Sequence, residues 1–488
     1  MVSMEHLKYT KSLCPICFKV IKAELVLESN IVYIRKQCEE HGYFEDVYMS
    51  DYRWYKRAQE YERVGKGIEN PRTKRSVGCP FDCGICNEHK SQTLLGIVDV
   101  TNACNLRCPI CFANAAAVGY LYQPSLEEIK AMLDNLHNNV PVPTYAVQLS
   151  GGEPTLRDDL PEIIRYADKI GIPHIEVNTN GVRIARDIEY LNELKKAGVS
   201  TFYLSFDSLT KEAYVKMKGA DLLDIKLKAL NNIREVGLHS VVLVPTLVKG
   251  INDNEVGSLI EFAVKNSDII RCVNFQPVSF AGRIESSKLK EFRITTSDVI
   301  NNAEKQTNGK IKLEDWYPIP FVAPISDFIA ALKSRPQPTF TVHQNCGAST
   351  FLIANDERTD YEPITKYVDV EKFIKEIAKA SEVLHAGKKT EGKLRAIAAL
   401  RHTKLGVSAS LAKGFLLSGT YGSLGKFMAK VVMVGDMHFM DPYNFDLERV
   451  ERCGIHYAIP DGRIIPFCSM NTLHRPKIEQ NFSVPLKK

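Results

Sequence analysis

The sequence predicts an α/β fold in which six parallel βα units make up the middle of the chain. Short apolar runs rich in β-branched and aromatic residues recur at 94–101, 145–150, 174–180, 201–207, 240–248 and 272–278. Helical patterns separate these runs, and such alternation indicates parallel strands with right-handed crossovers. Six units are fewer than the eight of a closed barrel, so a partial barrel and an open doubly wound sheet both fit.

Helix boundaries in this region follow from capping signals. Ser125 to Glu128 form a capping box that opens one helix. Apolar residues then line one face of the next helix, between Leu160 and Ile170. Glycines stand where helices should end, at Gly171, Gly198 and Gly237.

Length and composition indicate a protein of several domains. The chain has 488 residues, 44% hydrophobic and 25% charged, with a net charge of +5, which is ordinary for a globular protein. No basic block with interleaved aromatics is present, so we expect no nucleic-acid partner. Residues 1–12 lack the apolar core of a signal peptide. We therefore expect a cytoplasmic protein.

Cysteines cluster near the N-terminus, where nine of the 13 fall within the first 111 residues. In a reducing compartment such clusters indicate metal sites rather than disulfides. They divide the chain into a metal-knuckle module at 1–60, a cluster-binding segment at 61–93, the βα region at 94–282, and a C-terminal auxiliary-cluster and substrate domain at 283–488.

The central cysteine motif is Cys104, Cys108 and Cys111, directly after the first strand. Thiolates suit iron–sulfur clusters, and ligands of parallel α/β folds lie at the carboxyl ends of strands. Three thiolates leave one iron of a cubane open for another ligand. A structural zinc site is the alternative.

This motif resembles the C-x3-C-x2-C signature of the radical S-adenosylmethionine (SAM) superfamily, and three later strand ends support the resemblance. These are Gly151, Gly152 and Glu153; Asn178 and Asn180; and Ser205 and Asp207. The resemblance implies a partial (βα)6 radical SAM barrel. It also implies that the GGE motif contacts the amino group of SAM, that the later groups contact its carboxylate and ribose, and that the cluster cleaves SAM to a hydrogen-abstracting radical.

Four residues predict a separate mononuclear site. Cys14 and Cys17 form one C-x2-C knuckle, and Cys38 and His41 form a C-x2-H knuckle 20 residues later. Such spacing is typical of tetrahedral zinc, and iron is the alternative.

The remaining cysteines predict two auxiliary iron–sulfur clusters, making three [4Fe–4S] clusters in all. Cys79, Cys83 and Cys86 repeat the central spacing before the first strand, with His89 and other cysteines as candidates for a fourth ligand. Cys453 and Cys468 flank a predicted β-hairpin, and Cys346 is expected to join them. Cys272 is a further candidate ligand, or else a buried thiol. The resemblance also implies a small electron donor protein such as a ferredoxin.

The substrate is predicted from the whole-chain pattern. The order of the knuckles, cluster motifs and strand-end motifs resembles a subgroup that includes archaeal tetraether lipid synthases and pterin methyltransferase-like proteins. The main hypothesis is coupling of isoprenoid chain ends of an archaeal diether lipid, with an intermediate held on an auxiliary cluster. An amphipathic helix predicted at 411–435 would rest on the inner membrane face, and an ordinary core helix is its alternative.

Two other functions were weighed against lipid coupling. The first is radical SAM methylation of a pterin or similar small aromatic, which needs a short polar slot. The second is a non-catalytic iron–sulfur electron carrier, which needs a fourth protein ligand at the 104–111 cluster.

Overall fold

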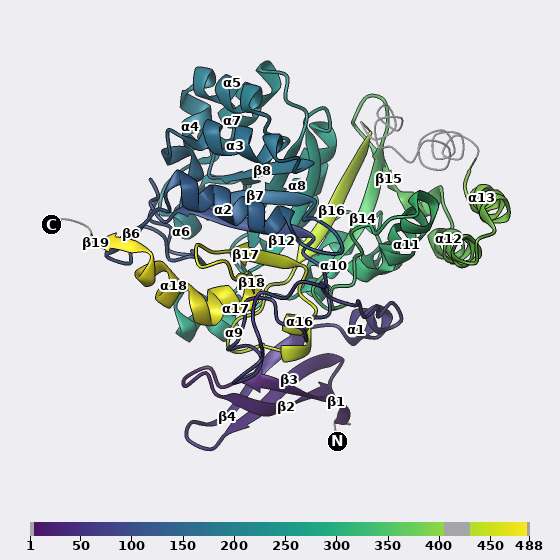
Figure 1. Ribbon diagram of the computed structural model, residues 1–488, viewed down its shortest axis with the longest axis horizontal. Helices are drawn as coiled ribbons and strands as arrows, with labels where there is room; N and C mark the ends of the chain where they lie inside the picture. Colours follow the sequence, from purple (N-terminus) through teal and green to yellow (C-terminus); the bar gives the residue numbers. More distant parts are fainter. Residues whose placement is uncertain (1–3, 405–429, 486–488) are drawn as a thin grey trace.

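The computed structural model describes residues 4–404 and 430–485 and is built around a mixed β-sheet with a long run of parallel strands (Figure 1). The six predicted strands are all present and lie side by side. In sheet order they are β12 (Ile270–Pro277), β10 (Val241–Val244), β9 (Thr201–Ser205), β8 (His174–Thr179), β7 (Ala146–Gly151) and β5 (Leu95–Thr101). The predicted α/β barrel fold is thereby confirmed.

The sheet continues into the C-terminal region at both of its edges. Strand β16 (Val431–Met437) pairs in parallel with β12, and β17 (Ile455–Ala458) pairs in parallel with β5. β14 (Gly347–Ala354) and the predicted hairpin strand β18 (Ile464–Pro466) then add antiparallel strands outside them. These strands pair with the backbone groups that the edges of the barrel sheet would otherwise leave exposed. The C-terminal region is therefore part of the barrel sheet.

Helices pack against the sheet as the capping signals predicted. Ser125 caps α2 (Leu126–His137) with both hydrogen bonds of a capping box. The apolar face of α3 (Leu160–Lys169) is buried in the main core, together with residues of the strands. The other helices between the strands are α4 (Val182–Arg186), α5 (Ile188–Ala197), α6 (Lys211–Lys218), α7 (Leu223–Glu235) and α8 (Val256–Lys265).

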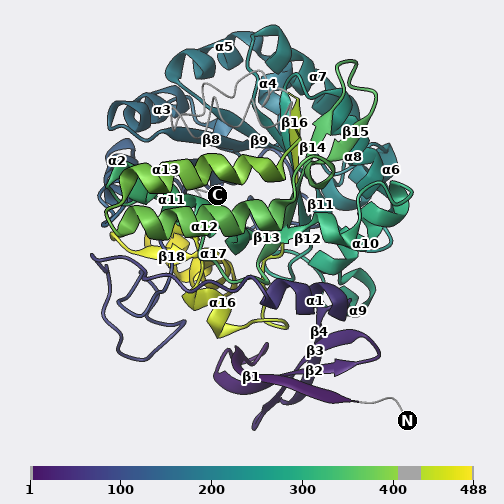
Figure 2. The same ribbon diagram turned by 90° about the vertical axis from the view of Figure 1, so that its right-hand side faces the viewer.

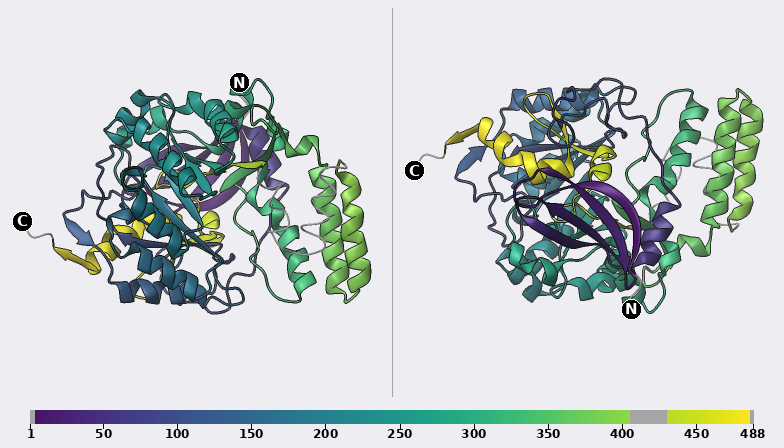
Figure 3. Two further views of the ribbon diagram at one scale, coloured as in Figure 1. Left: turned by 90° about the horizontal axis from the view of Figure 1, so that it is seen from above. Right: turned by 90° about the horizontal axis from the view of Figure 1, so that it is seen from below.

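The N-terminal module is an antiparallel meander that lies below the barrel (Figure 1; Figure 3, right). Its strands are β1 (Glu5–Leu13), β2 (Val20–Glu28), β3 (Ile31–Cys38) and β4 (Gly42–Met49), followed by α1 (Tyr52–Gln59). Polar contacts attach it to the C-terminal region: Thr10 Oγ1 donates to Asp446 Oδ1 at 2.8 Å. Buried Arg293 bridges Asp46 of β4 and Asp441.

A separate helical layer stands at one side of the sheet (Figure 2). Helices α11 (Ala323–Lys333), α12 (Val370–His385) and α13 (Lys389–Ala398) share their own core around Phe328 and Ile377. The remaining short elements of the C-terminal region are α9 (Leu289–Phe292), α10 (Thr296–Gln306), β13 (Tyr317–Pro318), β15 (Tyr361–Pro363), α16 (Leu447–Glu451), α17 (Phe467–Ser469) and α18 (Arg475–Asn481). Two-residue β11 (Thr246–Leu247) pairs with β12, and β19 (Ser483–Pro485) pairs with β6 (Tyr120–Tyr122).

The amphipathic helix predicted at 411–435 falls mainly outside the described residues. Where the description resumes, the chain forms strand β16 from Val431. None of the helices within 4–404 and 430–485 combines the length and the apolar character needed to cross a bilayer.

Candidate functional site

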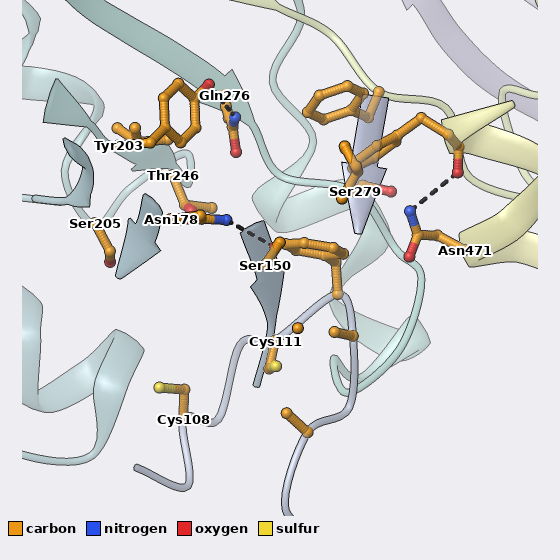
Figure 4. Close-up of a pocket in the computed structure, with 18 of the residues that line it drawn as sticks. Cys108, Cys111, Ser150, Asn178, Tyr203, Ser205, Thr246, Gln276, Ser279 and Asn471 are labelled. Atoms are coloured by element: carbon orange, nitrogen blue, oxygen red, sulfur yellow. Dashed lines mark hydrogen bonds between the residues drawn. The ribbon is translucent and has the colours of Figure 1, made fainter. Parts of the chain in front are cut away.

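The predicted catalytic motif lines a cavity at the carboxyl ends of the barrel strands (Figure 4). The loop after β5 contributes three thiols, and the loops after β7, β8 and β9 meet it there. The predicted residues that line this cavity are Cys104, Cys108, Cys111, Gly151, Gly152, Asn178, Asn180 and Ser205. The remaining two, Glu153 and Asp207, are buried behind the lining at 1% and 0% exposure.

The two glycines after β7 allow the cysteine loop to pack directly on that strand. The Gly152 N–H donates to Thr101 O at 2.7 Å, and the Glu153 N–H donates to Ala103 O at 2.8 Å. A Cβ at Gly151 would come within 2.0 Å of Thr101 O, and one at Gly152 within 2.2 Å of Ala103 O. Larger residues would therefore push the cysteine loop away from the sheet.

Glu153 ties two of the strand-end loops together. Its Oε1 accepts hydrogen bonds from Thr155 Oγ1 at 2.6 Å and Thr179 Oγ1 at 2.7 Å, and its Oε2 accepts from the Asn180 N–H at 2.7 Å. Asn180 in turn donates through Nδ2 to Asn105 Oδ1 in the cysteine loop at 2.7 Å. The described role of Glu153 is thus positional, and its predicted contact with the SAM amino group stays a prediction.

A lysine that the sequence analysis missed places positive charge beside the thiols. Lys218 at the end of α6 lines the cavity, and its Nζ lies 3.2 Å from Asp207 Oδ2. Burial acts to lower the pKa of Lys218, but Asp207 and Cys108 outweigh it and raise that pKa. No sequence motif identifies Lys218, because it approaches Cys108 only when α6 packs against the loop that carries the three cysteines.

The three thiols of the cavity fit an iron–sulfur cluster in which one iron has no protein ligand. Burial raises the pKa of Cys104 to about 12 and raises that of Cys108, so these thiols ionise readily only when a cation binds them. The described lining contains no His, Asp or Glu and no cysteine besides these three. A fourth protein ligand, which the electron-carrier hypothesis requires, is therefore absent from the described lining.

The N-terminal knuckles form a compact tetrahedral donor set. The ligand atoms of Cys14, Cys17, Cys38 and His41 all lie within 4.8 Å of one another. Cys17 Sγ is 3.9 Å from Cys38 Sγ, and His41 Nδ1 is 3.7 Å from Cys14 Sγ. Tetrahedral bonds of roughly 2.3 Å put ligand atoms roughly 3.8 Å apart, so the geometry suits one mononuclear ion.

Cys79, Cys83 and Cys86 surround a small cavity that His89 also lines. A C-terminal residue joins them: His474 is the last residue of a π-helical turn (Met470–His474). It donates through Nε2 to Pro80 O at 3.0 Å and lies beside the Cys83 thiol. A hydrogen bond from Cys79, and then His474 and Ser469, lower the pKa of Cys83 to about 5. His474 was missed because it lies almost 400 residues further along the chain than Cys83.

The thiols of the C-terminal cysteines Cys346, Cys453 and Cys468 lie close enough to influence one another's ionisation, and their predicted shared cluster stays a prediction. Burial raises the pKa of Cys453, and the nearby thiols of Cys468 and Cys346 add to that effect. The buried guanidinium of Arg449 lies beside Cys346 and Cys468. Cys272 instead lies within β12, flanked in register by Val242 and Met433, with 5% exposure. Its position favours the buried-thiol alternative.

Comparison with known proteins agrees with this geometry. Residues 98–263 match the Radical SAM superfamily, and residues 6–50 match the HMPTM N-terminal zinc ribbon domain. The 7,8-dihydro-6-hydroxymethylpterin dimethyltransferase of Methanocaldococcus jannaschii is 47% identical, over 98% of this chain and 96% of its own length. The chain belongs to the radical SAM superfamily. It is a radical SAM enzyme, and members of this superfamily use a [4Fe–4S] cluster and SAM.

More distant relatives match a smaller part of the chain. GTP 3′,8-cyclase of Listeria welshimeri is 32% identical over 38% of this chain and 55% of its own length. Among solved structures, SuiB of Streptococcus suis aligns with 46% of this chain and 48% of its own at 19% identity, with a TM-score of 0.38.

The predicted lipid substrate is wrong on this evidence. The near full-length M. jannaschii relative is named for a pterin substrate, which agrees with the alternative hypothesis and not with lipid coupling. The predicted diether lipid and membrane partners are wrong for the same reason. The sequence argument failed because its order of metal motifs is common to both kinds of protein and does not involve the substrate pocket.

Proposed function

We propose that this protein is a radical SAM methyltransferase that replaces a hydrogen atom of a reduced pterin with a methyl group taken from a separate one-carbon donor. The observation that carries the proposal is the 47% identity to a 7,8-dihydro-6-hydroxymethylpterin dimethyltransferase, which extends over nearly all of both chains. Since the identity includes the N-terminal metal module and the C-terminal region, it is not limited to the barrel that many radical SAM enzymes share.

The residues of the cavity have the roles that such a reaction requires. Cys104, Cys108 and Cys111 would hold the cluster, which with SAM supplies hydrogen-abstracting radical chemistry. The Gly151–Gly152 backbone and Asn180 would position SAM beside it. Aromatic residues of the opposite wall exclude water from the reacting atoms: the rings of Phe439 and Phe467 stack at 3.9 Å, and both line the cavity.

We further propose that the other cysteine groups bind metal. Cys79, Cys83 and Cys86 would hold one auxiliary [4Fe–4S] cluster, and Cys346, Cys453 and Cys468 a second. The zinc ribbon match and the compact donor set support one zinc or iron ion at Cys14, Cys17, Cys38 and His41. The imidazole of His474 lies beside Cys83 of the first auxiliary group.

Anaerobic cells that make reduced pterins provide the test, because they supply every co-reactant. The chain and its Cys104→Ala variant are expressed in parallel, and extracted pterins are analysed by mass spectrometry. Methylated pterins should appear only with the unaltered chain, and purified reduced protein should form 5′-deoxyadenosine from SAM. Formation of 5′-deoxyadenosine without any methylated pterin would overturn the proposed substrate, and an active Cys104→Ala variant would overturn the cluster assignment.

A further inference from the structure

The interior of the barrel carries polar side chains on three alternate strands, β7, β9 and β12. Gln148 on β7, Tyr203 on β9 and Gln276 on β12 all line the catalytic cavity. Figure 4 shows Tyr203 and Gln276 close together at the end of the cavity opposite Cys108. Gln148, Tyr203 and Gln276 are called the polar floor below.

Gln148 is oriented by a carboxylate beneath it. Its Nε2 donates to Glu176 Oε2 at 3.0 Å, and Glu176 also contacts His174 Nε2 through Oε1 at 3.2 Å. Because an ionised carboxylate only accepts, the amide group of Gln148 must face Glu176. Gln148 is 4% exposed, and its Oε1 has no hydrogen-bond partner among the described residues.

Tyr203 and Gln276 are hydrogen-bonded to each other. Gln276 Nε2 donates to the Tyr203 hydroxyl at 3.0 Å, and Asn274 Nδ2 donates to the same oxygen. A phenolic oxygen that accepts two hydrogen bonds keeps its own proton available to donate. Within the described part of the chain, Gln276 Oε1 likewise has no partner. The polar floor therefore offers two carbonyl acceptors and one hydroxyl donor to the cavity.

In number and kind, these two acceptors and one donor are complementary to the groups along one edge of a pterin ring. The pyrimidine edge carries two adjacent donors, the 2-amino group and N3–H, and one acceptor, the 4-oxo oxygen. The aromatic residues Phe439, Phe467 and Tyr457, which line the same cavity and stack on one another, suit a flat ring. The polar floor itself has no charged side chain, as is appropriate for a neutral heterocycle.

We infer that the polar floor binds the 2-amino-4-oxo edge of the substrate and so determines which heterocycle the enzyme accepts. The inference rests on the proposed function. A buried acceptor that a ligand leaves unpaired is costly, so the site rejects analogues that lack the matching donor. The competing explanation is that the polar floor only stabilises the barrel, in which case its residues would not affect ligand choice.

Binding of two probes to the holoenzyme distinguishes these explanations. The probes are 7,8-dihydro-6-hydroxymethylpterin and its 2-oxo analogue, in which an acceptor replaces the 2-amino donor. The unaltered protein should bind the 2-amino compound roughly tenfold more tightly. At least one of Gln148→Leu and Gln276→Leu should bind the two probes equally, since it lacks the acceptor that faces position 2.

Tyr203→Phe should weaken both probes by a similar factor, roughly fivefold, because the 4-oxo group is common to them. Tyr145→Phe, an exposed tyrosine outside the cavity, is the matched control and should change neither affinity. If the protein binds the pterin but every variant keeps the unaltered preference, the inference fails and the proposed function stands. Failure of the unaltered holoenzyme to bind either probe would instead overturn the proposed function, and the inference with it.

Discussion

One buried arginine, Arg293, links two carboxylates of the N-terminal module and the C-terminal region, and its removal should destabilise the whole chain. The side chains of Arg293, Asp46 and Asp441 are 3%, 6% and 0% exposed. Arg293 Nη1 donates to Asp441 Oδ2 at 2.8 Å, and its Nε donates to Asp46 Oδ1 at 3.3 Å. Arg293→Met would leave two buried carboxylates without their ion-pair partner, and the neighbouring Lys36, whose pKa burial lowers to about 8, would compensate only in part.

The expected loss follows from that burial. Removing one partner of a buried ion pair costs about 3–5 kcal/mol, because the remaining charge stays desolvated. Arg53→Met is the control: the Asp51 side chain is only 5% exposed, but that of Arg53 is 65% exposed, and Asp51 keeps hydrogen bonds from Asn30 and Asn301 after the change. An ion pair whose cation is solvated contributes about 0–1 kcal/mol. Urea unfolding at pH 7, followed by the fluorescence of the fully buried Trp54 and Trp316, measures both losses.

The difference in the free energy of unfolding between Arg293→Met and the unaltered protein should also depend on pH. Burial would raise the pKa of Asp441, but Arg293 lowers it below its ordinary value, so this carboxylate stabilises the fold at neutral pH. Burial raises the pKa of Asp46 even with Arg293 present. Without Arg293 both folded-state pKa values lie above the unfolded value of about 3.9, and protonation on acidification relieves the repulsion. The loss of unfolding free energy caused by Arg293→Met should become smaller from pH 7 to pH 5. A loss that is the same at both pH values, or no larger than the loss caused by Arg53→Met, would refute this reasoning.

Two further predictions concern the cofactor sites. Glu153→Gln should weaken SAM binding by roughly tenfold or more without unfolding the chain, because the glutamine NH2 group would face the Asn180 N–H and two donors cannot form a hydrogen bond. Equilibrium dialysis with labelled SAM measures the affinity, and an unchanged value would show that the hydrogen bonds of Glu153 are not needed for SAM binding. In anaerobic metal analysis, Cys83→Ala and Cys453→Ala should each lose one cluster, about four irons, and Cys14→Ala one mononuclear ion, whereas Cys272→Ala should lose none. Iron loss from Cys272→Ala would restore that residue as a ligand.

Much of the fold and the catalytic site could be predicted because the signals are local. Strand-length apolar runs found all six barrel strands, and Ser125 marked a helix start that the structure confirms. The thiols of Cys104, Cys108 and Cys111 lie within eight residues, so their spacing alone indicates a shared ligand. The knuckle residues Cys14 to His41 are likewise joined by one short antiparallel sheet.

Features that combine distant segments required the tertiary structure. Strands β16 and β17 join opposite edges of the barrel sheet although their sequences stand far from it, and His474 reaches Cys83 only through the C-terminal helix. Gln148, Tyr203 and Gln276 likewise come from three strands and are unremarkable in their own segments, so only the tertiary structure brings them to one cavity.

By itself, the sequence determined the barrel strands and grouped the thiols of Cys104, Cys108 and Cys111 and the mononuclear donor set, because periodicity and ligand spacing act over a few residues. Only the tertiary structure decided that Cys272 is buried within a strand, where Lys218 and Arg293 place their charges, and which polar atoms line the cavity. Those properties depend on burial and on distances between segments far apart in the chain, and local pattern contains neither.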